Sequence, residues 1–204
     1  MAEDCRSDTN ADENPSPRNR RDVLAVGTGL LFGAAIGRPD GAEAAKPPEK
    51  LSTQAGDRIQ IIKGDLKDKF VTPDMLETGA RPVEAFPFDT GNEILRRKNR
   101  LNRLLVVRLD PAEMDEETRA LSADGVLVFS ALCTHRACTI KSWMEEERHL
   151  RCHCHLSQFA ALSGGSVRDG PARRRLPMVP LAIDGDGFIV ATDGFNGKVG
   201  GAKK

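Results

Sequence analysis

Residues 133–138 read Cys-Thr-His-Arg-Ala-Cys and residues 152–157 read Cys-His-Cys-His-Leu-Ser, and these two stretches carry the most specific pattern in the sequence. We call them box one and box two. They hold four of the five cysteines and three of the four histidines in the 204-residue chain. One residue separates Cys133 from His135 in box one, and two residues separate Cys152 from His155 in box two. A single loop can therefore present a thiolate and an imidazole. Two such loops can converge on one metal centre.

Two kinds of metal centre use this donor set: Cys133, His135, Cys152 and His155. Structural zinc takes a closed tetrahedral Cys2His2 set, but its usual spacings pair cysteine with cysteine and histidine with histidine. In a binuclear iron–sulfur cluster, two thiolates can hold one iron while two imidazoles hold the other. The mixed Cys-x-His and Cys-x-x-His spacings favour the iron–sulfur centre.

The two boxes closely resemble the Rieske iron–sulfur proteins, whose pattern is C-T-H-x-x-C followed by C-x-C-H-x-S. The resemblance implies an all-β fold, with a small antiparallel β-sandwich base and an inserted cluster-binding subdomain. It implies one Rieske-type [2Fe–2S] cluster, with Cys133 and Cys152 on one iron and His135 and His155 on the other. It also implies a disulfide and a serine that donates a hydrogen bond to a cluster sulfur. These residues would be Cys138 with Cys154, and Ser157.

Several positions depart from the family pattern. Ala137 and Leu156 stand where glycine is usual, and His153 stands where proline is usual. Arg136 replaces the leucine that is common in quinol-oxidising members, and Phe159 replaces their tyrosine. Farther along the chain, residues 170–172 (Gly-Pro-Ala) resemble the family's third loop, which covers the cluster.

The chain is expected to divide into four segments. Residues 1–44 resemble a twin-arginine export signal, with Arg20 and Arg21 before a short apolar run and a small-residue site at Ala44. The signal is either cleaved there or retained as a membrane anchor. A linker over 45–57, a Rieske domain over 58–197 with its cluster-binding part at about 126–180, and a tail over 198–204 follow.

Short strands with close turn signals predict a small all-β domain. We expect strands at 58–63, 101–109, 126–131, 179–183 and 188–192, and a helical turn at 111–121 with Asp110 as its cap. His149 is interpreted as exposed and His153 as a surface residue, with hydrogen bonding to a ligand residue as the alternative for His153. The arginines at 173–175 are interpreted as a solvated turn, with a face for a partner protein as the alternative.

The charge balance of the chain limits the kinds of partner that it can bind. The 30 basic and 30 acidic side chains give a formal net charge of zero, which disfavours a nucleic-acid partner. The resemblance implies electron transfer, as the non-catalytic iron–sulfur subunit of an exported or membrane-attached redox complex. Its partner would be a catalytic or cytochrome subunit, including a c-type cytochrome, and its location periplasmic or on the periplasmic face of the inner membrane.

Two redox complexes remain open as the one to which this subunit would belong: a quinol–cytochrome c reductase, and a molybdenum oxidase in which it would be the small subunit. A ring-hydroxylating oxygenase component is disfavoured. Its terminal component needs a second, mononuclear iron site, for which the chain offers only His149 and His153 as spare histidines.

Overall fold

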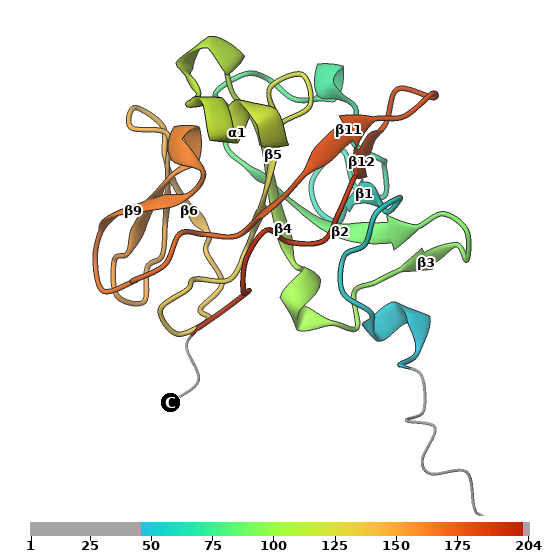
Figure 1. Cartoon of the computed structure of the whole chain (residues 1–204), viewed down its shortest axis with the longest axis horizontal. Coiled ribbons are helices and arrows are strands. Elements are labelled where there is room, and N and C mark those ends of the chain that lie inside the picture. The colour runs from blue at the N-terminus through green and yellow to red at the C-terminus, as the bar shows by residue number, and fades with distance from the viewer. Residues whose placement is uncertain (1–45, 202–204) are drawn as a thin grey trace, which may run out of the picture. The chain divides into compact units, whose positions relative to one another are not determined.

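Two antiparallel sheets build the part of the chain that the computed structural model describes, residues 46–201 (Figure 1). The larger sheet has the spatial order β10 (Met178–Val179), β5 (Val126–Ser130), β4 (Leu104–Arg108), β2 (Val83–Asp89), β1 (Arg58–Ile61), β12 (Ile189–Ala191) and β11 (Leu181–Ile183), with β3 (Ile94–Leu95) beside β2. The smaller sheet has the order β6 (Ser142–Met144), β7 (His149–Arg151), β8 (Gln158–Ala160) and β9 (Ser166–Asp169). These sheets confirm the predicted all-β, antiparallel class.

Helical structure is short in the described residues. It comprises α1 (Glu116–Leu121) and five 3-10 turns: η1 (Pro48–Lys50), η2 (Pro73–Met75), η3 (Arg100–Asn102), η4 (Pro111–Glu113) and η5 (Ala161–Ser163). Over residues 46–201, none of these helices has the length and apolar character that crossing a bilayer requires. The expected export signal lies outside the described residues.

The larger sheet curls until its two ends share one stretch of chain. Met178 and Val179 pair with β5 at one end, and Leu181–Ile183 pair with β12 at the other. Only Pro180 separates them, and proline has no N–H to donate to a ladder. Its carbonyl still accepts a hydrogen bond from Thr192 N. One extended segment therefore joins both edges and leaves few unpaired strand groups between them.

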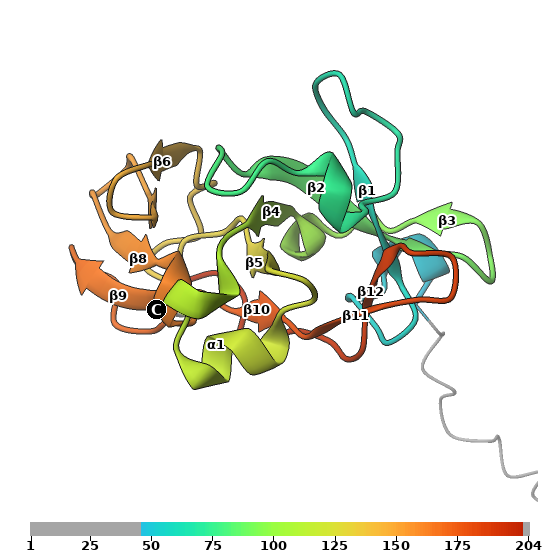
Figure 2. The same ribbon diagram turned by 90° about the horizontal axis from the view of Figure 1, so that it is seen from above.

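Strands β4 and β5 are buried on both faces, which explains their almost uninterrupted apolar sequence. Leu104, Val106, Val126 and Val128 face the core of the base. The alternate residues Leu105, Val107, Leu127 and Phe129 face a second core. This second core also contains Leu150 and Phe159 of the smaller sheet and both cysteines Cys133 and Cys152. The two strands thus form a wall shared by the base and the smaller sheet (Figure 2).

The segment 131–177 is inserted between β5 and β10 and carries the smaller sheet, as the family resemblance implied. The strands expected at 58–63, 101–109, 126–131 and 188–192 are present with shorter bounds, whereas the stretch 179–183 is divided at Pro180 between the end of β10 and β11. The helical turn at 111–121 is present as η4 and α1. The Asp110 carboxylate accepts from Ala112 N, as expected for a cap.

A buried arginine fixes residues 48–57 to the base. Arg96 is 3% exposed and forms an ion pair with the equally buried Asp57 at 3.0 Å. The same guanidinium also pairs with Asp89 and donates to the carbonyl of Pro48. Burial raises the pKa of Asp57, although Arg96 opposes that change. Much of the segment that was expected to be a linker is therefore packed onto the domain.

Candidate metal centre

Box one and box two lie in loops at the same end of the smaller sheet. Box one follows β5. The residues on either side of it, Leu132 and Thr139, form an isolated antiparallel bridge that closes the loop. Box two joins β7 to β8, two antiparallel neighbours, so its loop is a short hairpin connection. Backbone hydrogen bonds tighten each loop: Cys133 N donates to Cys138 O, and Cys152 N donates to Ser157 O.

Two of the cysteines in residues 46–201 are not in a disulfide, and their thiols meet inside the protein. Cys133 and Cys152 are 2% and 1% exposed, and their side chains lie within hydrogen-bonding reach of each other. Burial raises the pKa of the Cys133 thiol, and the backbone N–H groups of His135 and Arg136 act in the opposite direction because they point at its sulfur. Two sulfur donors from different loops therefore face one point, with amide donors already aimed at one of them.

The two imidazoles meet at the outer end of the same loops. The rings of His135 and His155 have centroids 4.7 Å apart, in an edge-to-face arrangement. His155 is exposed, whereas Nδ1 of His135 is buried and has no hydrogen-bond partner among the described residues. Burial lowers the pKa of His135, and the neighbouring His155 and Arg136 add to this effect. Nδ1 of His135 therefore has a lone pair or a proton that the described residues leave unused.

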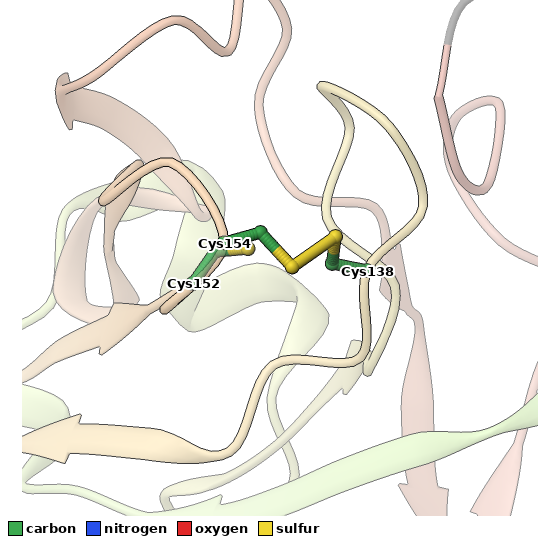
Figure 3. Close-up of side chains that lie close together, drawn as sticks. All are labelled: Cys138, Cys152 and Cys154. Atoms are coloured by element: carbon green, nitrogen blue, oxygen red, sulfur yellow. A yellow bond between two sulfur atoms is a disulfide. The ribbon is translucent and has the colours of Figure 1, made fainter.

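A disulfide joins the two loops. Cys138 and Cys154 are bonded, as the family resemblance implied, and Figure 3 shows the bond running from one loop to the other. Cys152 lies beside it, with all three sulfurs within 4.8 Å of one another. Because two of these sulfurs are spent on the disulfide, this trio is not a ligand set. Its closeness shows that the disulfide packs directly against the Cys152 thiol.

Ser157, the last residue of box two, is fully buried. Its Oγ accepts a hydrogen bond from Ala172 N at 3.1 Å, so its own proton remains free to be donated elsewhere. Ala172 belongs to residues 170–172, which the family resemblance singled out as the third loop. Gly170 makes the close approach possible: a Cβ there would lie 2.5 Å from Cα of Ser157 and 2.7 Å from its N. The third loop is therefore seated on the backbone of box two.

Two of the family departures fall on left-handed backbone. Ala137 has φ of 56° and Leu156 has φ of 61°, and both occupy positions where the family usually has glycine. A residue with a Cβ pays about 1–2 kcal/mol in this region. Both loops keep the glycine-type turn without the glycine, so the loop path is imposed by the surrounding contacts.

Residues 198–201, which were assigned to a tail, pack against box one. A Cβ at Gly201 would lie 2.8 Å from the carbonyl oxygen of His135. Arg174 donates to the carbonyls of Lys198 and Gly200, and the carbonyl of Arg174 accepts from Thr134 Oγ1 at 2.6 Å. Sequence analysis missed this clamp, and the paired glycines at 200–201 are the only local signal of so close an approach.

Other singled-out residues lie outside the centre. His149 was expected to be exposed, and this was wrong: the side chain is half-buried in β7, with Nδ1 3.3 Å from Gln158 Oε1. His153 is exposed, as expected. The arginine run is not merely a solvated turn, because Arg174 holds the tail and Arg175 forms an ion pair with Glu117 at 2.5 Å.

The donor set fits a [2Fe–2S] centre with mixed ligands. The buried, unpartnered Nδ1 of His135 is the observation that tests the fit, because an orphaned polar atom normally costs free energy unless something binds it. Two thiols adjoin each other and two imidazoles adjoin each other, as a centre with one all-sulfur iron and one histidine-ligated iron requires.

Comparison with known proteins gives the same assignment. The family model described as "Rieske [2Fe-2S] domain" matches residues 97–180. The cytochrome bc1 complex Rieske iron–sulfur subunit of Streptomyces lividans is 32% identical over 121 residues, which cover 59% of this chain and 68% of that protein. A predicted respiratory nitrate reductase Rieske subunit of Haloferax mediterranei is 35% identical over 97 residues. That match covers 48% of this chain and 43% of the haloarchaeal protein.

A solved structure is also similar. The soluble domain of Rieske protein II from Sulfolobus acidocaldarius shares 22% identity, with a TM-score of 0.39 over 49% of this chain and 65% of that one.

Proposed function

This chain belongs to the Rieske [2Fe-2S] proteins, and on that premise we propose that it carries single electrons as the iron–sulfur subunit of an exported or membrane-attached redox complex. We assign Cys133 and Cys152 to one iron of the cluster, and His135 and His155 to the other. The Rieske cluster supplies a one-electron carrier whose potential is raised by its neutral imidazole ligands.

The convergence of the two boxes is the observation that carries this proposal. Sulfur donors are buried and adjacent, imidazoles are adjacent nearer the surface, and His135 Nδ1 has no other partner among the described residues. A closed zinc site would need all four donors around one point. The separation into a thiol pair and an imidazole pair supports the binuclear assignment instead.

The chain's own residues have three tasks at the centre. The second core, with Phe159 and Leu150, keeps water from the thiol pair. Backbone N–H groups of His135 and Arg136 donate toward the Cys133 sulfur. Ser157 holds its hydroxyl in a fixed direction through the Ala172 hydrogen bond, so that its proton is available to a cluster sulfur.

The complex to which the subunit belongs is assigned from relatives. The Streptomyces lividans protein is a cytochrome bc1 subunit, which supports a quinol–cytochrome c reductase. The molybdenum-oxidase position stays the second candidate, because the exposed, charged Arg136 at the tip of box one is unlike a surface that enters an apolar quinol pocket. Electron exchange of the purified protein with a quinol analogue and with a soluble acceptor separates the two.

Export by the twin-arginine route is part of the proposal. The Cys138–Cys154 disulfide supports it, because disulfides persist in oxidising compartments. Replacing both Arg20 and Arg21 by lysine should retain the protein in the cytoplasm, and normal periplasmic yield from that variant would contradict this route.

The ligand assignment is tested by substitution and spectroscopy. Cys133→Ser, His135→Ala, Cys152→Ser and His155→Ala should each abolish the Rieske electron paramagnetic resonance signal and lower bound iron and sulfide. His153→Ala is the matched control, because it removes an exposed imidazole from the same loop. Persistence of the parent signal in any ligand variant, or one tetrahedral zinc and no sulfide in the parent, would refute the assignment.

A further inference from the structure

A groove lined by basic side chains lies between η1 and η3. Its volume is about 540 Å³, and its basic lining residues are Lys46, Lys50, Lys98 and Arg100. All four are exposed. We call these four residues the basic flank.

The basic flank adjoins the candidate metal centre. Arg100 donates to the carbonyl oxygen of Ala137, in box one, at 2.5 Å. A Cβ at Gly200 would touch both the Ala137 methyl group and Leu101 of η3. In Figure 1, η1 and η3 lie along the same edge of the molecule as the loops below the smaller sheet. A partner that occupied the groove would therefore also reach box one.

The charge of the flank is unbalanced. Residues 46–50 and 97–100 contain five basic side chains and one acidic side chain, Glu49, which pairs with Lys98 at 2.9 Å. Among the described residues, neither Lys50 nor Arg100 has a carboxylate within 4.0 Å, and the same is true of Arg136 at the tip of box one. Elsewhere on the base, several arginines are paired: Arg58 with Asp184, and Arg108 with Asp124.

Exposed groups of box two complete the surface. His155 is exposed, and the apolar Leu156 beside it is 49% exposed. On the far side of box two, the Asp169 carboxylate accepts hydrogen bonds from Gly170 N and Gln158 Nε2. The tip therefore has an apolar contact point with positive charge on the side of box one.

We propose that the basic flank docks a protein electron-transfer partner that carries a cluster of surface carboxylates. This inference rests on the proposed function. Complementary charge steers two proteins into encounter and fixes their orientation, while the contact point itself can stay small and apolar. Here the flank would orient the partner so that its own redox group faces His155 and Leu156.

The experiment compares two soluble one-electron acceptors of opposite surface charge, an acidic plastocyanin and a basic cytochrome c. Stopped-flow absorbance measures oxidation of the reduced protein by each acceptor between about 20 and 200 mM salt. Biolayer interferometry with immobilised plastocyanin measures binding without electron transfer. The test variant is Lys46→Glu with Lys50→Glu and Lys98→Glu, and among the described residues none of these lysines hydrogen-bonds to box one, whereas Arg100 does.

A matched control changes the same charge elsewhere. Lys63→Glu with Lys67→Glu and Lys69→Glu alters three exposed lysines between β1 and β2. We expect the plastocyanin rate of the parent to fall about tenfold over the salt range, and the test variant to be about tenfold slower at low salt. The control should stay within about twofold of the parent, and binding should follow the same order.

Several results would overturn the inference. These are a plastocyanin rate independent of salt, an equal loss in the control, or faster reaction of the parent with cytochrome c at low salt. Lysine-dependent binding to phosphatidylserine vesicles with an unchanged plastocyanin rate would instead identify a membrane surface. If both acceptors oxidise the protein without charge preference, the proposed function stands and this inference fails; a protein that assembles no cluster would refute both.

Discussion

Gly170→Ala should loosen the third loop from box two and destabilise the domain. Gly170 has φ of 84°, and an added Cβ would lie 2.5 Å from Ser157 Cα and 3.0 Å from the carbonyl carbon of Leu156. These are backbone atoms of box two, so rotation of a side chain cannot relieve the contact. The third loop must move away, and the hydrogen bond from Ala172 N to Ser157 Oγ is lost.

The magnitude can be separated into two contributions. Left-handed backbone costs alanine about 1–2 kcal/mol, offset by about 0.4–1 kcal/mol because alanine has fewer unfolded conformations than glycine. Loss of a buried hydrogen bond that leaves an unsatisfied partner costs about 1–3 kcal/mol more. Gly187→Ala isolates the first contribution, because Gly187 has φ of 86° and nothing within 4 Å of an added Cβ.

Thermal unfolding, followed by visible absorbance of the cluster and by far-UV circular dichroism, measures the difference. A free-energy change of 1 kcal/mol shifts the midpoint by about 2–4 °C for a domain of 150–250 residues. Gly170→Ala should therefore unfold about 2–12 °C below Gly187→Ala. Equal midpoints for the two variants would refute the close packing of the third loop on Ser157.

Four further predictions concern other contacts. Ser157→Ala should lower the midpoint potential in voltammetry by about 60–130 mV at most, since a hydrogen bond to a charged group is worth about 1.5–3 kcal/mol. Ser157→Thr, which keeps the hydroxyl donor, is the control, and an unchanged potential in Ser157→Ala would contradict the role of the hydroxyl. Cys138→Ser with Cys154→Ser should lower the free energy of unfolding by about 3 kcal/mol, because the bond spans 16 residues, and labelling of both native thiols in the parent would disprove the pairing. Arg96→Met should cost about 3–5 kcal/mol in urea unfolding, because it strands the buried Asp57, and adding Asp57→Asn should recover part of that loss. Asp115→Ala should lower the free energy of unfolding by about 1 kcal/mol at neutral pH, because the Asp115 carboxylate caps α1 at Thr118 N; Asp115→Asn should not, because it keeps an acceptor. The Thr118 hydrogen bond lowers the pKa of Asp115. This stabilisation is therefore present above the pKa of the unfolded state and should disappear as pH falls through the lower pKa of the folded state.

The candidate ligands could be predicted because their signal is local. Cys133 and His135, like Cys152 and His155, are neighbours in sequence, and the pattern of each box is specific. The strands β4 and β5 were equally visible, because burial on both faces gives them continuous apolar sequence.

The strands that were missed are short or sit in mixed sequence. β6, β7 and β8 have three residues each, too few to show alternation, and β2 contains Pro87. The stretch 65–121 supplies β2 and β3, which were not predicted, beside the predicted β4 of the base. The clamp of residues 198–201 on box one depends on a contact more than 60 residues apart in sequence, which no local pattern reports.

The shared wall of β4 and β5 makes the domain one cooperative unit. Each strand contributes alternate side chains to two cores, so removing segment 131–177 would expose Leu105, Val107, Leu127 and Phe129 to water together. The cluster-binding part is consequently a poor candidate for transplantation onto another scaffold unless both strands travel with it. In native-state hydrogen exchange, the amides of β4 and β5 should open only with global unfolding. Release of iron by local fluctuation is therefore confined to the two loops, and the wall behind them stays closed.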